Sequence, residues 1–143
     1  MAIYEKFIGR SRESFISLKD CRENFKITYE NDFNFAYDVI DVLGTEKPDK
    51  LALLYVSNEG EEKRFTFGDM KRLSDKAANY LVSEGVKKGD PVLLILKRSY
   101  LFWIITLALN KIGAIMVPAS NMLKGKDYVY RCNKAKIKYA VIT

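Results

Sequence analysis

The sequence predicts an α/β protein, in which N-terminal helices and a β-hairpin precede βαβαβ units of a parallel sheet. From residue 92 onward, apolar runs of strand length alternate with amphipathic segments of helix length, the pattern of parallel strands joined by crossover helices. The composition agrees, because 48% hydrophobic and 29% charged residues are ordinary for a globular chain. At 143 residues the chain has about the length of one domain and can bury a core.

The first part of the chain is expected to be helical. Residues 11–25 bring three apolar side chains to one helical face. Asn34 is then expected to cap a second helix, whose apolar stripe begins at Ala36. Gly44 is expected to stop this helix, because glycine commonly lies just past a helix end. We take residues 1–30 as an N-terminal helical segment.

A β-hairpin and a long helix are expected next. Leu51–Val56 is typical of a strand, and residues 63–67 can pair back onto it across a polar turn that contains glycine. Thr66 and Asp69 have the spacing of a capping box, so a helix is expected to begin there. The apolar face of this helix continues as far as Gly85, which is expected to end it.

The predicted sheet region contains five elements. They are strand 92–97, helix 100–112, strand 114–117, helix 125–135 and strand 139–142. Residues 92–96 of the first strand are all apolar, as is typical of strands buried on both faces of a parallel sheet. No segment follows the last strand to cover it, which is expected for the first part of a larger domain.

Positive charge is concentrated in the second half of the chain. Residues 87–143 carry eleven Lys and Arg against two Asp, and the whole chain has a formal net charge of +6. An anionic partner would account for this charge, and so would a solvated helix face; the sequence leaves both open. No nucleic acid is expected as a partner, because no recognised nucleic-acid-binding module accompanies the basic residues.

Secreted, membrane-spanning and zinc-binding proteins are poor matches to this sequence. The N-terminus lacks the apolar core of a signal peptide, and the most apolar window, residues 100–109, is about half of a bilayer span. Cys21 and Cys132 lie far apart and the chain has no histidine, so neither a zinc site nor a disulfide framework is expected. We predict a cytoplasmic location and no metal ligands.

No catalytic residue is predicted. The glycines have neither the G-x-G-x-x-G nor the P-loop spacing, and no His is present to act as a base near neutral pH. Asp38 and Asp41 are expected on the solvated side of their helix rather than as a catalytic pair. Phe102 and Trp103 are expected in the helical core rather than in an acyl pocket.

The loop after strand 114–117 is the best site candidate from geometry. Residues 118–124, PASNMLK, lie just beyond the carboxyl end of that strand. Ligands of open parallel sheets bind at this edge. The loop is therefore expected to form at most one wall of a ligand site, on a unit that is otherwise scaffold.

Four segments carry motifs of a known family, and the motifs occur along the chain in the order that the family has. FTFGDMKRLSDKAANYL and LALNKIGAIMVPAS are similar to its first and second core motifs, and FNFAYDVIDVL and DYVYRCNKAKIKYAVIT extend the likeness. On these residues the chain resembles the N-terminal portion of AMP-forming acyl-CoA synthetases, in the adenylate-forming superfamily, and is most similar to the medium-chain branch. The resemblance covers roughly residues 30–143, so residues 31–143 are expected to be the first, incomplete part of an AMP-binding domain.

The resemblance implies a two-step ligase reaction for a full-length enzyme. ATP and a fatty or other short- or medium-chain carboxylate give an acyl-adenylate and pyrophosphate, and the thiol of CoA then displaces AMP. ATP, Mg and CoA are thus implied for the full-length protein. The phosphate loop, the ribose-binding Asp and the catalytic lysine domain of the family are expected beyond residue 143. These 143 residues alone are therefore expected to be inactive and to hold no cofactor.

One functional element is implied within the chain. In acetyl-CoA synthetase-like members the loop after the second core motif borders the CoA channel, and it corresponds here to Ser120, Asn121 and Met122. The family's aromatic residue and glycines are replaced by Ser-Asn-Met, which makes backbone approach less open. Arg131 and the lysines near it are expected either to assist an anionic cofactor or to be solvated.

Other interpretations stay open at the level of sequence. The chain could be a stand-alone, non-catalytic α/β protein that binds CoA or a partner protein. Self-association is also expected if the last strand leaves apolar surface uncovered.

Overall fold

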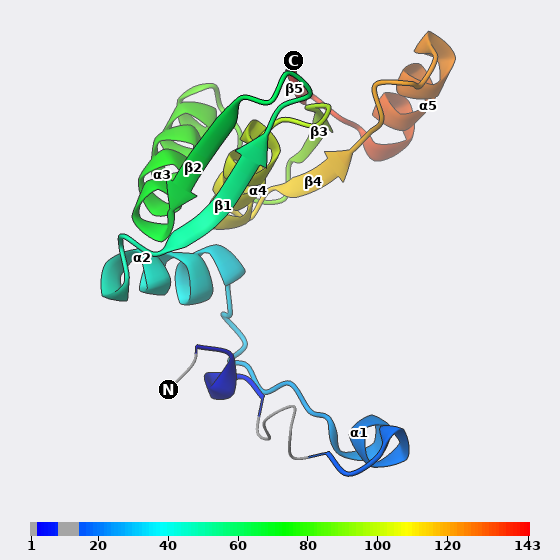
Figure 1. Ribbon diagram of the computed structural model, residues 1–143. Coiled ribbons are helices and arrows are strands. Elements are labelled where there is room, and N and C mark those ends of the chain that lie inside the picture. Colours follow the sequence, from blue (N-terminus) through cyan, green and yellow to red (C-terminus); the bar gives the residue numbers. More distant parts are fainter. Residues whose placement is uncertain (1–2, 9–14) are drawn as a thin grey trace. The chain divides into compact units, whose positions relative to one another are not determined.

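The computed structural model describes residues 3–8 and 15–143 and divides into two compact units, Met1–Phe33 and Asn34–Thr143 (Figure 1). The first unit contains η1 (Ile3–Lys6) and α1 (Leu18–Asn24), and an isolated antiparallel bridge pairs Ile8, after η1, with Ile27, after α1. The helix predicted for residues 11–25 begins only at Leu18, where Ser17 Oγ accepts a hydrogen bond from the Asp20 amide. Its predicted part at residues 11–14 lies outside the described residues.

The second unit begins with a helical segment in two parts. A π-helix, η3 (Ala36–Asp41), continues into α2 (Val42–Glu46). Asn34 Oδ1 accepts a hydrogen bond from the amide of Ala36 at 3.0 Å, so the predicted cap is confirmed. The predicted stop at Gly44 is wrong. An added Cβ there would lie 2.9 Å from both Lys71 Cβ and the Phe67 carbonyl oxygen, so this glycine allows two helices to approach closely.

The hairpin and the long helix form as predicted. Strands β1 (Leu51–Val56) and β2 (Glu62–Thr66) are antiparallel, and α3 (Phe67–Ser83) follows directly. Thr66 Oγ1 accepts from the Asp69 amide and the Thr66 amide donates to Asp69 Oδ2, each at 3.1 Å. The capping box is therefore complete, and Gly85, at φ +92°, ends the helix.

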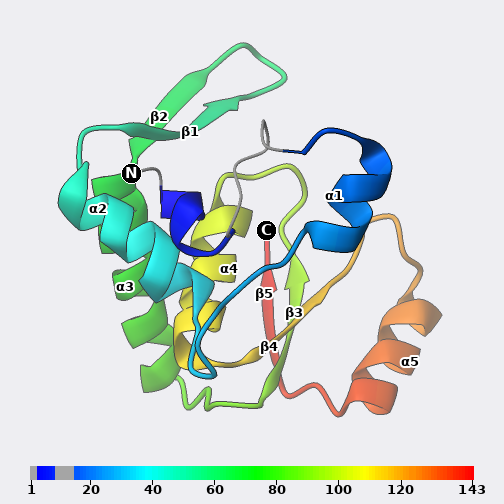
Figure 2. The same cartoon turned by 90° about the horizontal axis from the view of Figure 1, so that it is seen from below.

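Three parallel strands make the second sheet. The elements in order are β3 (Pro91–Ile95), α4 (Leu101–Ile112), β4 (Ile115–Pro118), α5 (Gly125–Ala135) and β5 (Tyr139–Ile142). Their order in the sheet is β4-β3-β5, with both pairs parallel. Figure 2 shows α3 and α4 on one side of these strands and α5 on the other. The expected α/β class and the parallel sheet are confirmed.

The core lies between this sheet and the helices α3 and α4. One cluster joins Leu81 and Val86 to Val92, Leu94 and Leu109, with Phe102 packed against it. A second cluster lies under η3 and the hairpin and contains Ala36, Met70, Ile104 and Leu107. Helix α4 contributes to both clusters, so it positions the loops at its two ends relative to the hairpin. None of the described helices is both long and apolar enough to cross a bilayer.

Two expectations about side chains are corrected. Trp103 is 54% exposed and is not in the core, because the neighbouring residue Phe102 occupies the side of α4 that packs on the sheet. Asp41 is not on a solvated face: its Oδ1 lies 2.7 Å from Nζ of Lys111 and its side chain is only 15% exposed. Asp38 Oδ2 accepts a hydrogen bond from the Asn34 amide at 2.6 Å, so this carboxylate binds the backbone just before the helix begins.

Candidate functional site

A hollow of about 750 Å³ lies at the carboxyl edge of the parallel sheet, and we call it the sheet-edge hollow. Its volume is in the range of small-molecule sites. It contains the loop predicted as the site candidate, with Ser120, Asn121 and Met122 all among its lining residues. The lining residues come from the hairpin, the ends of β3 and β4 with the turns that follow them, the start of α4 and the residue after β5: Tyr55, Asn58, Leu94, Leu96, Lys97, Arg98, Ser99, Phe102, Pro118, Ala119, Ser120, Asn121, Met122 and Thr143.

The loop after β4 is held by hydrogen bonds to β3, to α5 and within the loop itself. The Ala119 amide donates to the Leu94 carbonyl at 2.9 Å, which continues the pairing of β4 with β3. Ser120 Oγ accepts from the Met122 amide at 3.1 Å, and the Tyr128 hydroxyl donates to the Ser120 carbonyl at 2.8 Å. Ser120 thus shapes the turn, whereas Met122 is 87% exposed and free to contact a ligand.

The turn between β3 and α4 contributes residues that sequence reasoning missed. Lys97 and Arg98 follow the buried strand directly and line the sheet-edge hollow. Lys97 adopts a left-handed backbone, with φ of +46°. A basic pair at the carboxyl end of a predicted buried strand was the available signal, since this is the edge at which ligands bind.

The basic residues of α5 do not take part in this hollow. Lys124, Lys126 and Arg131 are absent from its lining. Arg131 instead donates from Nη1 to the Asp127 carbonyl at 3.2 Å, within its own helix. Of the two expectations for this helix, the arrangement favours solvation.

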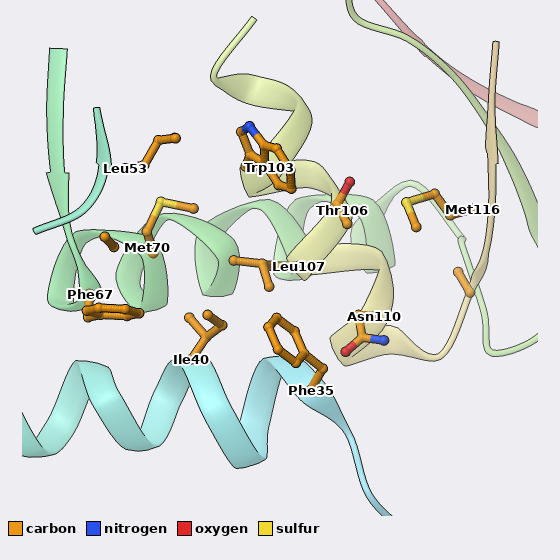
Figure 3. Close-up of a pocket in the computed structure, with 12 residues that line it drawn as sticks. Phe35, Ile40, Leu53, Phe67, Met70, Trp103, Thr106, Leu107, Asn110 and Met116 are labelled. Carbon is orange, nitrogen blue, oxygen red and sulfur yellow. The ribbon is translucent and has the colours of Figure 1, made fainter. Parts of the chain in front are cut away.

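A second hollow, of about 570 Å³, lies between the hairpin, the helices and β4, and we call it the apolar hollow. In Figure 3, Ile40 approaches it from η3, Phe35 from the residue just before η3, Met70 from α3 and Met116 from β4. Trp103 and Leu107 face it from α4. Its lining is nearly all hydrocarbon, so it suits an apolar group rather than a charged one.

Neither hollow has the donor set of a metal site. Among residues 3–8 and 15–143, no cluster of His, Cys, Asp or Glu is arranged to hold a metal ion. The part of the chain described here thus offers a cationic, partly aromatic hollow at the sheet edge, without a carboxylate side chain among its lining residues.

A family model described as "AMP-binding enzyme" matches residues 41–143. The chain belongs to this AMP-binding enzyme family. The expected likeness to adenylate-forming enzymes is confirmed by curated relatives. The human mitochondrial acyl-coenzyme A synthetase ACSM3 is 32% identical over 130 residues, covering 87% of this chain and 22% of the relative. The rat mitochondrial acyl-coenzyme A synthetase ACSM5 is 36% identical over 117 residues, covering 78% of this chain and 20% of the relative.

Solved structures of AMP-binding enzymes share the fold. The N-terminal domain of FACL13 from Mycobacterium tuberculosis, crystallised with an inhibitor, has a TM-score of 0.68 at 25% identity, covering 76% of this chain and 26% of that one. The N-terminal subdomain of Klebsiella oxytoca NpsA has a TM-score of 0.65 at 27% identity, covering 73% of this chain and 26% of that one. The chain thus corresponds to an N-terminal portion of this fold.

The chain spans about a fifth of the length of the curated relatives it matches. Those relatives are named as mitochondrial, and the predicted cytoplasmic location is not confirmed. The comparisons also give no support to the expected self-association.

Proposed function

We propose that this chain is the N-terminal part of an AMP-forming acyl-CoA synthetase. The whole enzyme would join a carboxylate to ATP, releasing pyrophosphate and forming an acyl-adenylate, and the CoA thiol would then attack the acyl carbon and release AMP. The observation that carries the proposal is the match to acyl-coenzyme A synthetases, which extends over 76–95% of this chain. The family match favours this function over a stand-alone binding protein.

The 143 residues serve as scaffold in this proposal. Acyl-adenylate formation needs groups that stabilise the charge on the transferring phosphate. The described residues contain no candidate metal cluster, and the chain has no phosphate-loop motif. ATP and Mg would therefore bind to other parts of the enzyme, and residues 31–143 would be the first part of its AMP-binding domain.

The sheet-edge hollow is proposed as one wall of the CoA site. Ser120 holds the turn, and Asn121 and Met122 lie on the exposed side of it. A wall of this kind orients CoA so that its thiol can reach the acyl-adenylate, since correct placement of two reactants lowers the barrier. The residues of the wall do no proton transfer.

The test compares the complete polypeptide that carries this sequence with residues 1–143 alone. We expect the complete polypeptide to release pyrophosphate with ATP, Mg²⁺ and an aliphatic carboxylate, and to form a thioester when CoA is added. Residues 1–143 alone should release none. Absence of pyrophosphate release by the complete polypeptide, across acids from acetate to palmitate, would overturn the proposal. Release by residues 1–143 alone would overturn the scaffold role.

A further inference from the structure

Two basic side chains in the sheet-edge hollow have no ion-pair partner among the residues that the structure describes. Lys97 and Arg98 are both exposed, and neither takes part in an ion pair or a side-chain hydrogen bond within the described ranges 3–8 and 15–143. Arg72 and Lys111, by contrast, are paired with carboxylates. Within the described part of the chain, the hollow therefore presents two positive charges that no carboxylate neutralises to a ligand that enters it.

The backbone fixes where these two residues stand. Ser99 donates its amide to the Leu96 carbonyl at 3.1 Å, which closes a tight turn around Lys97 and Arg98. Lys97 takes the left-handed conformation in this turn, a conformation that residues with a Cβ adopt rarely. The turn follows a strand whose residues Val92–Ile95 are all buried, so the basic pair is attached to the core.

The rest of the lining suits an organic phosphate. Tyr55 and Phe102 supply aromatic surface, and Asn58 and Asn121 supply amide groups that can both donate and accept hydrogen bonds. No carboxylate side chain is present among the lining residues to repel an anion. Guanidinium and ammonium groups are the ordinary protein partners of phosphate.

The phosphates of ATP fit this hollow poorly. Magnesium-bound nucleotide phosphates are usually held together with a carboxylate ligand to the metal, which the hollow does not provide. The phosphates of CoA lie on its nucleotide end, away from the thiol that reacts. They can therefore bind at an exposed edge while the thiol reaches inward.

We propose that Lys97 and Arg98 bind the phosphate groups at the nucleotide end of CoA. This inference rests on the proposed function, because it names the second substrate at the same hollow. Both residues are binding residues and take no part in the transfer of the acyl group.

The experiment uses the complete polypeptide with the variants Lys97→Gln and Arg98→Gln. Lys76→Gln is the matched control, since Lys76 is an exposed lysine on α3 outside the hollow. We expect each of the two variants to raise the Kd of CoA about tenfold in a direct titration, as the loss of one charged contact does. The Kd of pantetheine, which has the thiol but no phosphate, should stay within twofold of the wild-type value. The KM of ATP in ATP–pyrophosphate exchange, which needs no CoA, should also be unchanged.

The outcomes separate this inference from the proposed function. Loss of CoA affinity no greater than in Lys76→Gln would overturn the inference, as would equal weakening of CoA and pantetheine. A rise in the KM of ATP would assign the pair to ATP and would also overturn it. If exchange is absent from the wild type, the proposed function fails, whereas the direct CoA titration still decides whether the basic pair binds CoA.

Discussion

Lys97 and Lys136 are the non-glycine residues with positive φ, at +46° and +53°, among those the structure describes. The left-handed conformation brings Cβ close to the following carbonyl oxygen and costs about 1–2 kcal/mol in a residue other than glycine. Lys97 closes the turn at the sheet-edge hollow, whereas Lys136 is the C-cap of α5. The same strain thus occurs once at the candidate site and once at an ordinary helix end.

We predict that Lys97→Gly increases the free energy of unfolding by about 0.5–1 kcal/mol, because relief of the strain exceeds the entropy that glycine adds to the unfolded chain. Lys136→Gly should have a similar effect. Urea denaturation measures both, with Lys97→Ala as the control that removes the charge but keeps the strain. A Lys97→Gly variant less stable than Lys97→Ala would contradict the prediction.

Asp69 makes stability depend on pH through the start of α3. The amide of Thr66 donates to its carboxylate and Arg72 lies 3.0 Å away, so these contacts lower the pKa of Asp69 below its ordinary value of 3.8. A carboxyl whose pKa is lowered by folding stabilises the protein above its unfolded-state pKa. That contribution is lost as the pH falls through the folded-state value.

Asp69→Asn should therefore cost about 1 kcal/mol of unfolding free energy near pH 6, as the loss of a capping interaction does. The difference between variant and wild type should shrink as the pH falls below about 4. Chemical denaturation at several pH values measures it. A difference that stays constant from pH 6 to pH 2.5 would show that the charge of Asp69 is not what stabilises the helix.

At the scale of elements, Lys111 joins three helices. Its Nζ lies 2.7 Å from Asp41 Oδ1 on η3 and 2.6 Å from Asp75 Oδ1 on α3, and its own side chain is 2% exposed. The ammonium group also lies 5.5 Å from the centroid of the Tyr37 ring. A buried cation needs such partners, because an unpaired charge in the interior is strongly destabilising.

We predict that Lys111→Met lowers the free energy of unfolding by about 3 kcal/mol, since it leaves the carboxylate of Asp41 with little solvent and no partner. The double variant Lys111→Met with Asp41→Asn should recover part of this loss. Urea denaturation of the single and double variants gives the coupling, and Lys76→Met on the exposed side of α3 is the control. Purely additive effects would argue against the ion pair as the source.

The elements whose signals are local could be predicted from the sequence. Three elements have the predicted bounds: the strands Leu51–Val56 and Tyr139–Ile142 and the helix Gly125–Ala135. Their signals, such as the spacing of apolar residues, depend only on residues close together in the sequence. Gly44 and Asp41 were misread because their partners, Lys71 and Lys111, are distant in the chain. The loop of the candidate site could be predicted, because it follows a strand at the carboxyl edge of the sheet. The place of Lys97 in the hollow depends on its left-handed backbone angle, which the residue type lysine does not predict.

At the scale of the whole molecule, the buried core belongs to one unit. Both core clusters consist of residues between Ala36 and Val141, which all lie in Asn34–Thr143. We predict that residues 34–143, expressed without the first 33, unfold in a single cooperative transition. Thermal unfolding followed by circular dichroism tests this, with residues 1–143 as the reference. A gradual, non-cooperative loss of signal would show that the first 33 residues are needed for the core.

The strand order β4-β3-β5 also has a consequence for synthesis. The central strand is made first, and its neighbour β5, which pairs Tyr139 with Val92, emerges from the ribosome almost fifty residues later. At about 5–20 residues per second, that interval is roughly 2–10 s. Throughout that time the backbone N–H and C=O groups of β3 on the β5 side have no partner strand. This unpaired edge is open to pairing with chaperones or with other nascent chains.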